Sequence, residues 1–160
     1  MKKITLITIC ALCLISTKYD SQTELKDGML LKKQSSDNIY LIIDSKKCLI
    51  TDLLILKNLF VNLNSIVTVS NLTFETLPFG NPIKEAYLCK GTEAPIFLVI
   101  NKIKRHVSSV AVFNAFNFNW GAIKVMKDEE LIKIKTGNPI VLYNYNLNIY
   151  EEPLPCGNKD

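Results

Sequence analysis

The sequence predicts an α+β fold built from two tandem repeats of about 57 residues and a closing strand at the C-terminus. Sliding the chain by 57 positions lays residues 28–83 over residues 85–140 without a gap. In each copy, short apolar runs rich in β-branched and aromatic residues alternate with polar turns, as is typical of strands. Apolar residues at helical spacing follow each set of runs, which indicates short helices.

Twelve of the 56 superposed positions carry the same residue in both copies, and most of the others exchange one apolar residue for another. The longest identical run, Gly-Asn-Pro-Ile, closes both copies. The first-copy members of the identical pairs are Leu31, Lys33, Ile39, Leu41, Ile43, Lys47, Asn62, Ile66, Gly80, Asn81, Pro82 and Ile83.

Residues 1–17 have the pattern of a secretory signal peptide, because Lys2 and Lys3 precede an almost wholly apolar run over residues 4–15. As a helix this run would span about 18 Å, short of the roughly 30 Å hydrocarbon core of a bilayer. We therefore expect export and cleavage near position 17, which leaves a secreted or envelope protein without a stable membrane span.

Cys10 and Cys13 lie within this apolar run, so a lipid anchor on one of them is the alternative. Lipid attachment normally requires a small residue before the cysteine, whereas Ile9 and Leu12 precede these two. A lipoprotein is therefore disfavoured.

After a polar lead-in over residues 18–27, the first repeat covers residues 28–84 and the second covers residues 85–140. Three apolar runs separated by polar turns predict an antiparallel meander in each repeat. The middle run is apolar on both faces, so we expect a central strand that is covered on both sides. The predicted strands are residues 29–33, 39–43 and 48–50 in the first repeat, and 86–90, 96–100 and 104–107 in the second.

One or two short helices are expected after each meander. Ser108 or Ser109 is expected to cap the first helix of the second repeat, and Thr51 or Asp52 is expected to cap its counterpart. Short strands follow, at residues 66–69 in the first repeat and 123–126 in the second.

A last helical turn is predicted to begin in the second repeat at Asp128, whose side chain would accept from the free amides of that turn. The Gly-Asn-Pro run then ends each unit. Its glycine is expected to adopt a positive φ, and its proline prevents the helix from continuing.

Residues 141–150 alternate between apolar and asparagine side chains and predict the closing strand. Tyr143, Tyr145 and Leu147 would share one face. We interpret this segment as a truncated third repeat that covers an otherwise open sheet edge. Residues 151–160 form a proline-broken tail.

The second repeat resembles a short, mostly uncharacterised module of exported and surface-associated bacterial proteins. Its turn departs from that pattern at Lys102, where the module has glycine, and the first repeat lacks both the tryptophan and the acidic helix. The resemblance implies an envelope setting, often beside cell-wall or carbohydrate-active domains, and implies no catalytic residue. It is carried by residues 88–90, 96–105, Phe113, residues 117–120, Val125, and residues 128–131 and 137–140.

The composition is that of an ordinary globular chain, with 48% hydrophobic and 21% charged residues. The formal net charge is +4. Removing Lys2 and Lys3 lowers it to +2, which is too small a bias to indicate a nucleic-acid partner.

Basic residues recur at the matching hairpin turns of the two repeats. One interpretation is structural: a solvated hairpin that prevents pairing with another sheet edge. The other is functional: a cationic patch that binds an anionic surface polysaccharide. Nearby aromatic residues would offer faces for sugar stacking unless they belong to the core. The candidate ligand-binding residues are Lys46, Lys47, Lys102, Lys104, Arg105, Trp120, Tyr143 and Tyr145.

The sequence predicts no catalytic residue, metal ligand or cofactor site, because it contains none of the common motifs for them. His106, the single histidine, corresponds to Leu49 of the first repeat and is expected to be structural. Three cysteines lie beyond the signal segment: Cys48, Cys89 and Cys156. Reduced thiols are favoured over a disulfide between Cys89 and Cys156.

The leading hypothesis is a non-enzymatic, exported envelope or surface module that binds a glycan or another envelope protein. A small cell-wall-acting enzyme, or an inhibitor of one, is the alternative. A structural accessory subunit is a third possibility.

Overall fold

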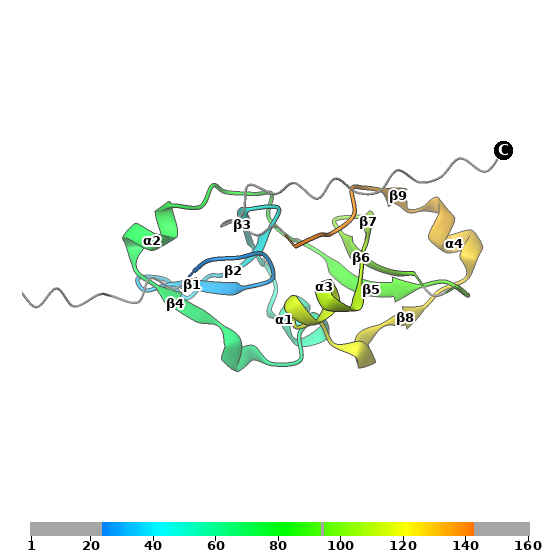
Figure 1. The fold of residues 1–160 in the computed structure, drawn as a ribbon, viewed down its shortest axis with the longest axis horizontal. Helices are drawn as coiled ribbons and strands as arrows, with labels where there is room; N and C mark the ends of the chain where they lie inside the picture. The colour runs from blue at the N-terminus through cyan, green and yellow to red at the C-terminus, as the bar shows by residue number, and fades with distance from the viewer. Residues whose placement is uncertain (1–23, 94, 143–160) are drawn as a thin grey trace, which may run out of the picture.

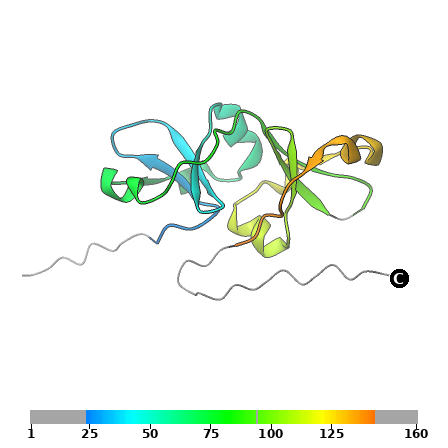
Figure 2. The same ribbon diagram turned by 90° about the horizontal axis from the view of Figure 1, so that it is seen from above.

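A computed structural model describes residues 24–93 and 95–142 of the chain. It has two β-sheets and four short α-helices, which confirms the predicted α+β class. The sheets lie on either side of a central pair of helices, and a further helix lies at each outer end (Figure 1; from above in Figure 2). We call residues 24–83 the first half and residues 84–142 the second half.

The elements follow the same order in the two halves. The first sheet has the order β3-β2-β1-β4 and consists of β1 (Leu30–Lys33), β2 (Ile39–Ile43), β3 (Lys46–Leu49) and β4 (Val67–Val69). The second has the order β8-β5-β6-β7-β9 and consists of β5 (Ala86–Lys90), β6 (Ile96–Ile100), β7 (Ile103–His106), β8 (Lys124–Val125) and β9 (Lys135–Thr136). The helices are α1 (Leu53–Leu59), α2 (Asn71–Glu75), α3 (Val110–Ala115) and α4 (Asp128–Lys133), with 3-10 turns η1 (Leu63–Ser65) and η2 (Trp120–Ala122).

The predicted antiparallel meanders are confirmed as β1-β2-β3 and β5-β6-β7. Two further pairings were not predicted. β4 and β8 pair in parallel with β1 and β5, and the end of each half runs in parallel beside β3 or β7, as in the bridges Ile50–Ile83 and Val107–Ile140.

These pairings bear on the predicted closing strand. Each meander, within the described chain, already has a neighbour along at least part of both outer edges. Residues 143–150 lie outside the described residues, and Val141 and Leu142 belong to no strand.

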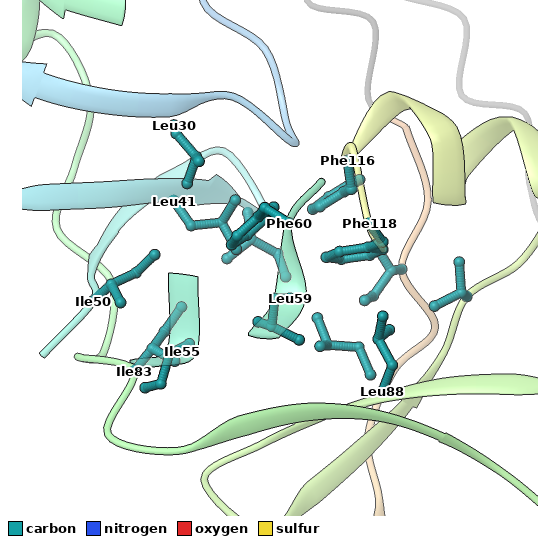
Figure 3. Close-up of a cluster of buried hydrophobic side chains, with 14 of the residues drawn as sticks. Leu30, Leu41, Ile50, Ile55, Leu59, Phe60, Ile83, Leu88, Phe116 and Phe118 are labelled. Atoms are coloured by element: carbon teal, nitrogen blue, oxygen red, sulfur yellow. The ribbon is translucent and has the colours of Figure 1, made fainter. Parts of the chain in front are cut away.

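A single apolar core joins the two halves (Figure 3). Both sheets and the central helices α1 and α3 contribute to it, and Phe116 stacks on Phe118 with ring centroids 5.2 Å apart. Residues just after α1 and α3 also pair across the halves, through the antiparallel bridge Phe60–Phe118. Burial of this shared surface is the main force holding the halves together.

Smaller clusters lie on the outer faces of the sheets, under α2 and α4. In β2, Leu41 faces the shared core while Tyr40 and Ile42 face α2. In β6, Leu98 faces the shared core and Val99 faces the α4 side. The prediction that the middle strands are central and covered on both faces is therefore confirmed.

The ungapped register predicted from the sequence is wrong in the first strand. Leu30 pairs with Leu41 in β2, and Leu88 pairs with the matching Leu98 in β6. Leu30 and Leu88 both face the shared core, whereas Leu31 faces α2. The counterpart of Leu88 is therefore Leu30, one residue away from the identity in the sequence. Six residues separate the paired Lys32 and Ile39, whereas five separate the paired Lys90 and Ile96.

The predicted caps are confirmed for α1 and α3. The Asp52 side chain accepts from Leu54 N at 2.8 Å, and the Ser109 side chain accepts from Val112 N at 3.2 Å. A helix does begin at Asp128 as predicted, but the capping role expected of its side chain is wrong, because the carboxylate accepts instead from Thr92 N at 2.9 Å in the β5–β6 connection. This backbone hydrogen bond lowers the pKa of Asp128.

The positive φ expected at the closing glycines is also wrong, since neither Gly80 nor Gly137 has one. Glycine is required there by close packing. A Cβ on Gly80 would collide with Cys48 Sγ, and a Cβ on Gly137 would lie 2.8 Å from Ile103 Cγ2. The glycines let the chain pass closely beside β3 and β7.

The turns between β2 and β3 and between β6 and β7 have positive φ at both central residues, with Asn101 at 48° and Lys102 at 66°. This is the type I′ hairpin turn, which favours glycine at its second central position. Lys102 is exposed there, so its side chain contributes little packing.

We expect Lys102→Gly to stabilise the chain by about 1 kcal/mol, because a non-glycine residue in the left-handed region costs roughly 1–2 kcal/mol. Urea unfolding followed by circular dichroism measures the change. Lys102→Ala is the matched control, because it removes the same side chain and keeps the backbone cost. Equal stability of the two variants would contradict the explanation.

Candidate functional site

The structure separates the predicted hairpin lysines into two groups. Lys46 and Lys102 are exposed, whereas Lys47 is 1% and Lys104 is 8% exposed. Both interpretations of these lysines, a solvated hairpin and a surface cationic patch, are therefore wrong for Lys47 and Lys104. Successive strand residues point to opposite faces, and Lys47 and Lys104 point toward the helix that covers the outer face of their sheet.

Lys47 lies beneath α2. Its Nζ donates to the carbonyl oxygen of Phe74 at 2.7 Å and lies 3.6 Å from Glu75 Oε2. The same atom lies 4.1 Å from the ring centroids of both Phe74 and Phe79. A carbonyl at a helix C-terminus has no partner within the helix and attracts positive charge. The hydrogen bond from Lys47 to Phe74 O therefore stabilises the packing of α2 on the sheet.

Lys104 makes the equivalent contact in the second half. Its Nζ donates to the carbonyl oxygen of Leu131 in α4, which is the position 57 residues after Phe74. One ring accompanies it, that of Phe97, at 5.7 Å. Lys47 and Lys104 thus have the same structural role in the two halves.

Arg105 connects the two halves. Its guanidinium makes two hydrogen bonds of 2.7 Å to the carboxylate of Asp44, in the β2–β3 turn. It also donates to the carbonyl oxygens of Asn138 at 2.7 Å and Pro139 at 3.2 Å. These four bonds use four of its five N–H donors, so we assign Arg105 to the junction of the halves.

The aromatic candidates are also divided. Trp120 is 48% exposed, and its ring lies 4.0 Å from the buried ring of Phe113, centroid to centroid. One face of the indole is therefore used for packing. Tyr143 and Tyr145 lie outside the described residues.

A cleft of about 630 Å³ lies between α1 and the start of β5. Its walls are the N-terminal cap and outer face of α1, the connection between the halves, and the segment from η2 to β8. The lining residues are Asp52, Leu54, Ile55, Lys57, Asn58, Lys84, Glu85, Ala86, Tyr87, Leu88, Asn119, Gly121, Ala122, Ile123 and Lys124.

Three exposed lysines, Lys57, Lys84 and Lys124, line this cleft. Within the described chain none of them forms an ion pair with a carboxylate. Lys124 Nζ lies 5.2 Å from the ring centroid of Tyr87, and burial raises the pKa of the Tyr87 phenol. Lysines without carboxylate partners at a cleft are suited to bind carboxylate, phosphate or sulfate groups.

Two carboxylates line the same cleft, but they are not equivalent. Asp52 caps α1 through its bond to Leu54 N. Glu85 is exposed. The cleft therefore has three positive charges against two negative ones, one of which is held at the helix cap.

The cleft is open because the two halves do not pack in the same way at their first strands. Gly28, at φ 92°, lies against the end of α3, where an added Cβ would be 2.7 Å from Ala115 O. By strand register the counterpart of Gly28 is Ala86, and the counterpart of Ala115 is Asn58. Both of these line the cleft, so the space that is closed on one side of the molecule is open on the other.

Asn101 fixes the wall formed by the connection between the halves. Its side-chain oxygen accepts from Lys84 N at 2.9 Å and from Glu85 N at 3.4 Å, and its side-chain nitrogen donates to Pro82 O at 2.8 Å. Asn119 Oδ1 shapes the opposite wall by accepting from Gly121 N at 2.9 Å. The cleft is thus lined by backbone held in place by side-chain hydrogen bonds.

The three cleft lysines were not among the binding residues predicted from the sequence. They lie on three separate elements that only the packing of the halves brings together. One signal was available in the sequence. At the offset of 57 residues Lys57 lies over Asn114 and Lys124 over Val67, so each of these charges occurs in one half only.

The other reactive side chains do not gather at the cleft. Cys48 and Cys89 are free thiols in the core, and burial raises the pKa of both. His106 packs on the Phe97 ring with centroids 5.8 Å apart. Cys156 lies outside the described residues.

In the part of the chain that the structure describes, no three His, Cys, Asp or Glu side chains are grouped closely enough to hold a metal ion. The described helices are also too short or too polar to cross a bilayer. No protein-family model, curated protein or solved structure matches the chain.

Proposed function

We propose that this chain is a non-enzymatic binding module of the cell envelope or cell surface, and that the cleft between α1 and β5 holds an anionic part of its partner. The observation that carries the proposal is the group of three lysines in the cleft without carboxylate partners. Complementary charge increases the rate and the specificity of association. Export by residues 1–17 is part of the same proposal.

The proposal also treats the two halves as copies of one duplicated unit. Four observations support this: the twelve identities, the shared element order, the matching type I′ turns and the matching lysine bonds under α2 and α4. If the two copies have diverged where the first strand of one half meets the helix of the other, the cleft is expected on one side of the molecule only. The closing strand over residues 141–150 remains a prediction within this scheme.

The test is retention of residues 18–160 on purified envelope fractions at rising salt, compared for two triple variants. The cleft variant is Lys57→Glu, Lys84→Glu and Lys124→Glu. The control, Lys46→Glu, Lys102→Glu and Lys133→Glu, changes the net charge equally at exposed lysines outside the cleft.

We expect the cleft variant to bind at least about tenfold more weakly, because three exposed charge contacts contribute roughly 0.5 kcal/mol each. The control should bind within about twofold of the parent protein. Retention should also weaken as salt rises, because salt screens exposed charges. Equal losses in the two variants, or a larger loss in the control, would contradict the proposed site.

A further inference from the structure

In each half, one side chain links the segment before the first strand to the turn between the second and third strands. The two links run in opposite directions. In the first half the linking side chain comes from the segment before the strand. The carboxylate of Asp27, which is 3% exposed, accepts from Asp44 N at 3.1 Å and from Ser45 N at 3.0 Å. The acidic side chain is therefore buried in holding the turn.

In the second half the linking side chain comes from the turn. Asn101 Oδ1 accepts from Lys84 N at 2.9 Å and from Glu85 N at 3.4 Å. The Asn101 side-chain nitrogen donates to Pro82 O at 2.8 Å, and its backbone N–H donates to Glu85 O at 3.1 Å. All four hydrogen bonds go to backbone atoms of the connection between the halves, so the side chains of Lys84 and Glu85 take no part in the link.

This reversal changes what the equivalent residues can do. By the strand register that relates Gly28 to Ala86, the counterpart of Asp27 is Glu85. Asp27 is buried, whereas Glu85 and the preceding Lys84 are exposed and line the cleft. The link through Asn101 thus holds the backbone of a cleft wall and leaves the charged side chains of that wall available to a ligand.

From this arrangement we infer that Asn101 is a positioning residue for the cleft: it holds the backbone of Lys84 so that the ammonium group of Lys84 meets an anionic group of the partner. Asn101 itself is not among the cleft-lining residues. The inference rests on the proposed function and adds a residue that acts on binding through another. Holding a group in its binding position before the ligand arrives lowers the cost of association.

The three cleft lysines differ in their need for such support. Lys57 belongs to α1, so the hydrogen bonds of the helix hold its backbone. Lys124 belongs to β8 and pairs with Cys89 of β5. Lys84 belongs to no helix or strand, and the bond from its N–H to Asn101 Oδ1 takes the place of that regular pairing.

A purely structural role for Asn101 makes a different prediction. A type I′ turn favours asparagine at its first central position, so Asn101 could serve the turn alone. Glycine adopts the same left-handed conformation without steric cost. Asn101→Gly therefore keeps the turn and removes the three side-chain bonds to the connection. A role in positioning must act through Lys84, whereas a role in the turn is independent of that lysine.

The experiment measures retention of residues 18–160 on the immobilised envelope fraction that retains the parent protein, over a series of protein concentrations. Asn101→Gly is compared with Lys102→Gly, the matched control, which places glycine in the same turn and keeps the Asn101 bonds. Asn101→Gly is also combined with Lys84→Ala and, separately, with Lys57→Ala. Circular dichroism establishes that each variant is folded.

We expect Asn101→Gly to raise the concentration for half-maximal retention about three- to tenfold, the cost of ordering one long side chain on binding. Lys102→Gly should stay within about twofold of the parent. In the Lys84→Ala background, Asn101→Gly should add less than about twofold. In the Lys57→Ala background its full effect should persist, because independent contributions to binding are additive in free energy.

The inference is overturned if Asn101→Gly binds within about twofold of the parent, if Lys102→Gly weakens binding equally, or if the effect of Asn101→Gly persists in the Lys84→Ala background. Loss of the native circular dichroism spectrum in Asn101→Gly would assign Asn101 to folding and would also overturn it. In each case the proposed function stands if the triple cleft variant still binds more weakly than its control. If those two triple variants bind alike, the proposed function fails as well.

Discussion

Replacing Lys47 by alanine is expected to lower the free energy of unfolding by about 3 kcal/mol. A hydrogen bond from a charged group contributes roughly 1.5–3 kcal/mol, and a cation–π contact shielded from water contributes about 2 kcal/mol. The loss of these interactions is offset in part because the variant no longer buries a charge. Lys47 makes one such bond, to Phe74 O, and lies over two rings. Urea unfolding monitored by circular dichroism measures the change.

The neighbouring residue provides the control. The Lys46 side chain is exposed and forms no ion pair with a carboxylate of the described residues, so Lys46→Ala should change stability by less than about 0.5 kcal/mol. Lys104→Ala should be destabilising in the same way as Lys47→Ala, by a smaller amount, because a single ring lies near its Nζ. Similar effects of Lys46→Ala and Lys47→Ala would show that the buried lysine does not fasten α2.

Gly28→Ala is the second large effect, again about 3 kcal/mol of destabilisation. An alanine at the φ of 92° found here would cost roughly 1–2 kcal/mol. Its Cβ would also lie 2.7 Å from Ala115 O and 3.0 Å from Phe116 Cα, so the backbone at the end of α3 would have to move. Overpacking of this kind typically costs 1–3 kcal/mol.

Gly121→Ala is the matched control for Gly28→Ala. Gly121 has no positive φ, and an added Cβ would meet a single neighbouring atom, Asn119 Oδ1, at 3.3 Å. We expect a change below about 1 kcal/mol, measured in the same unfolding experiment. If the two glycine variants lost equal stability, the tight packing of Gly28 on α3 would not be the cause.

The local structure could largely be predicted from the sequence. The apolar runs give β2 and β6 at their observed bounds, and the caps Asp52 and Ser109 were among the expected ones. These features depend on a few neighbouring residues. The parallel pairing of β4 and β8 with the first strand of each half was missed, because β8 has two residues and its pairing is set by the chain's return path.

Identity between the two halves at an offset of 57 residues was informative at some positions and misleading at others. Asn62 and Asn119 match because each side chain accepts from the backbone two residues later. Leu31 and Leu88 match in the sequence yet face different clusters, because the paired residues of the first two strands are one residue closer along the chain in the second half. A shift of one residue moves each side chain of a strand to the opposite face of the sheet. The continuous apolar runs of these strands do not reveal which residues lie on which face.

The candidate site could not be predicted, because it arises from how the halves pack. Lys46 and Lys47 are neighbouring lysines that the sequence does not distinguish. The orientation of β3 decides which of the two side chains is buried. Lys57 and Lys124 lie far apart in the chain and meet at the cleft because Asn58 and Ala86 leave open the space that Gly28 and Ala115 close on the other side. Such contacts between elements are set by tertiary packing.

The most direct test of a partner-binding cleft is hydrogen exchange of residues 18–160, measured by mass spectrometry with and without the retained envelope fraction. We expect slower exchange in peptides that cover residues 84–88 and 121–124, and unchanged exchange at the hairpin turns around Ser45 and Lys102. Protection confined to those turns, with the cleft segments unchanged, would contradict this expectation.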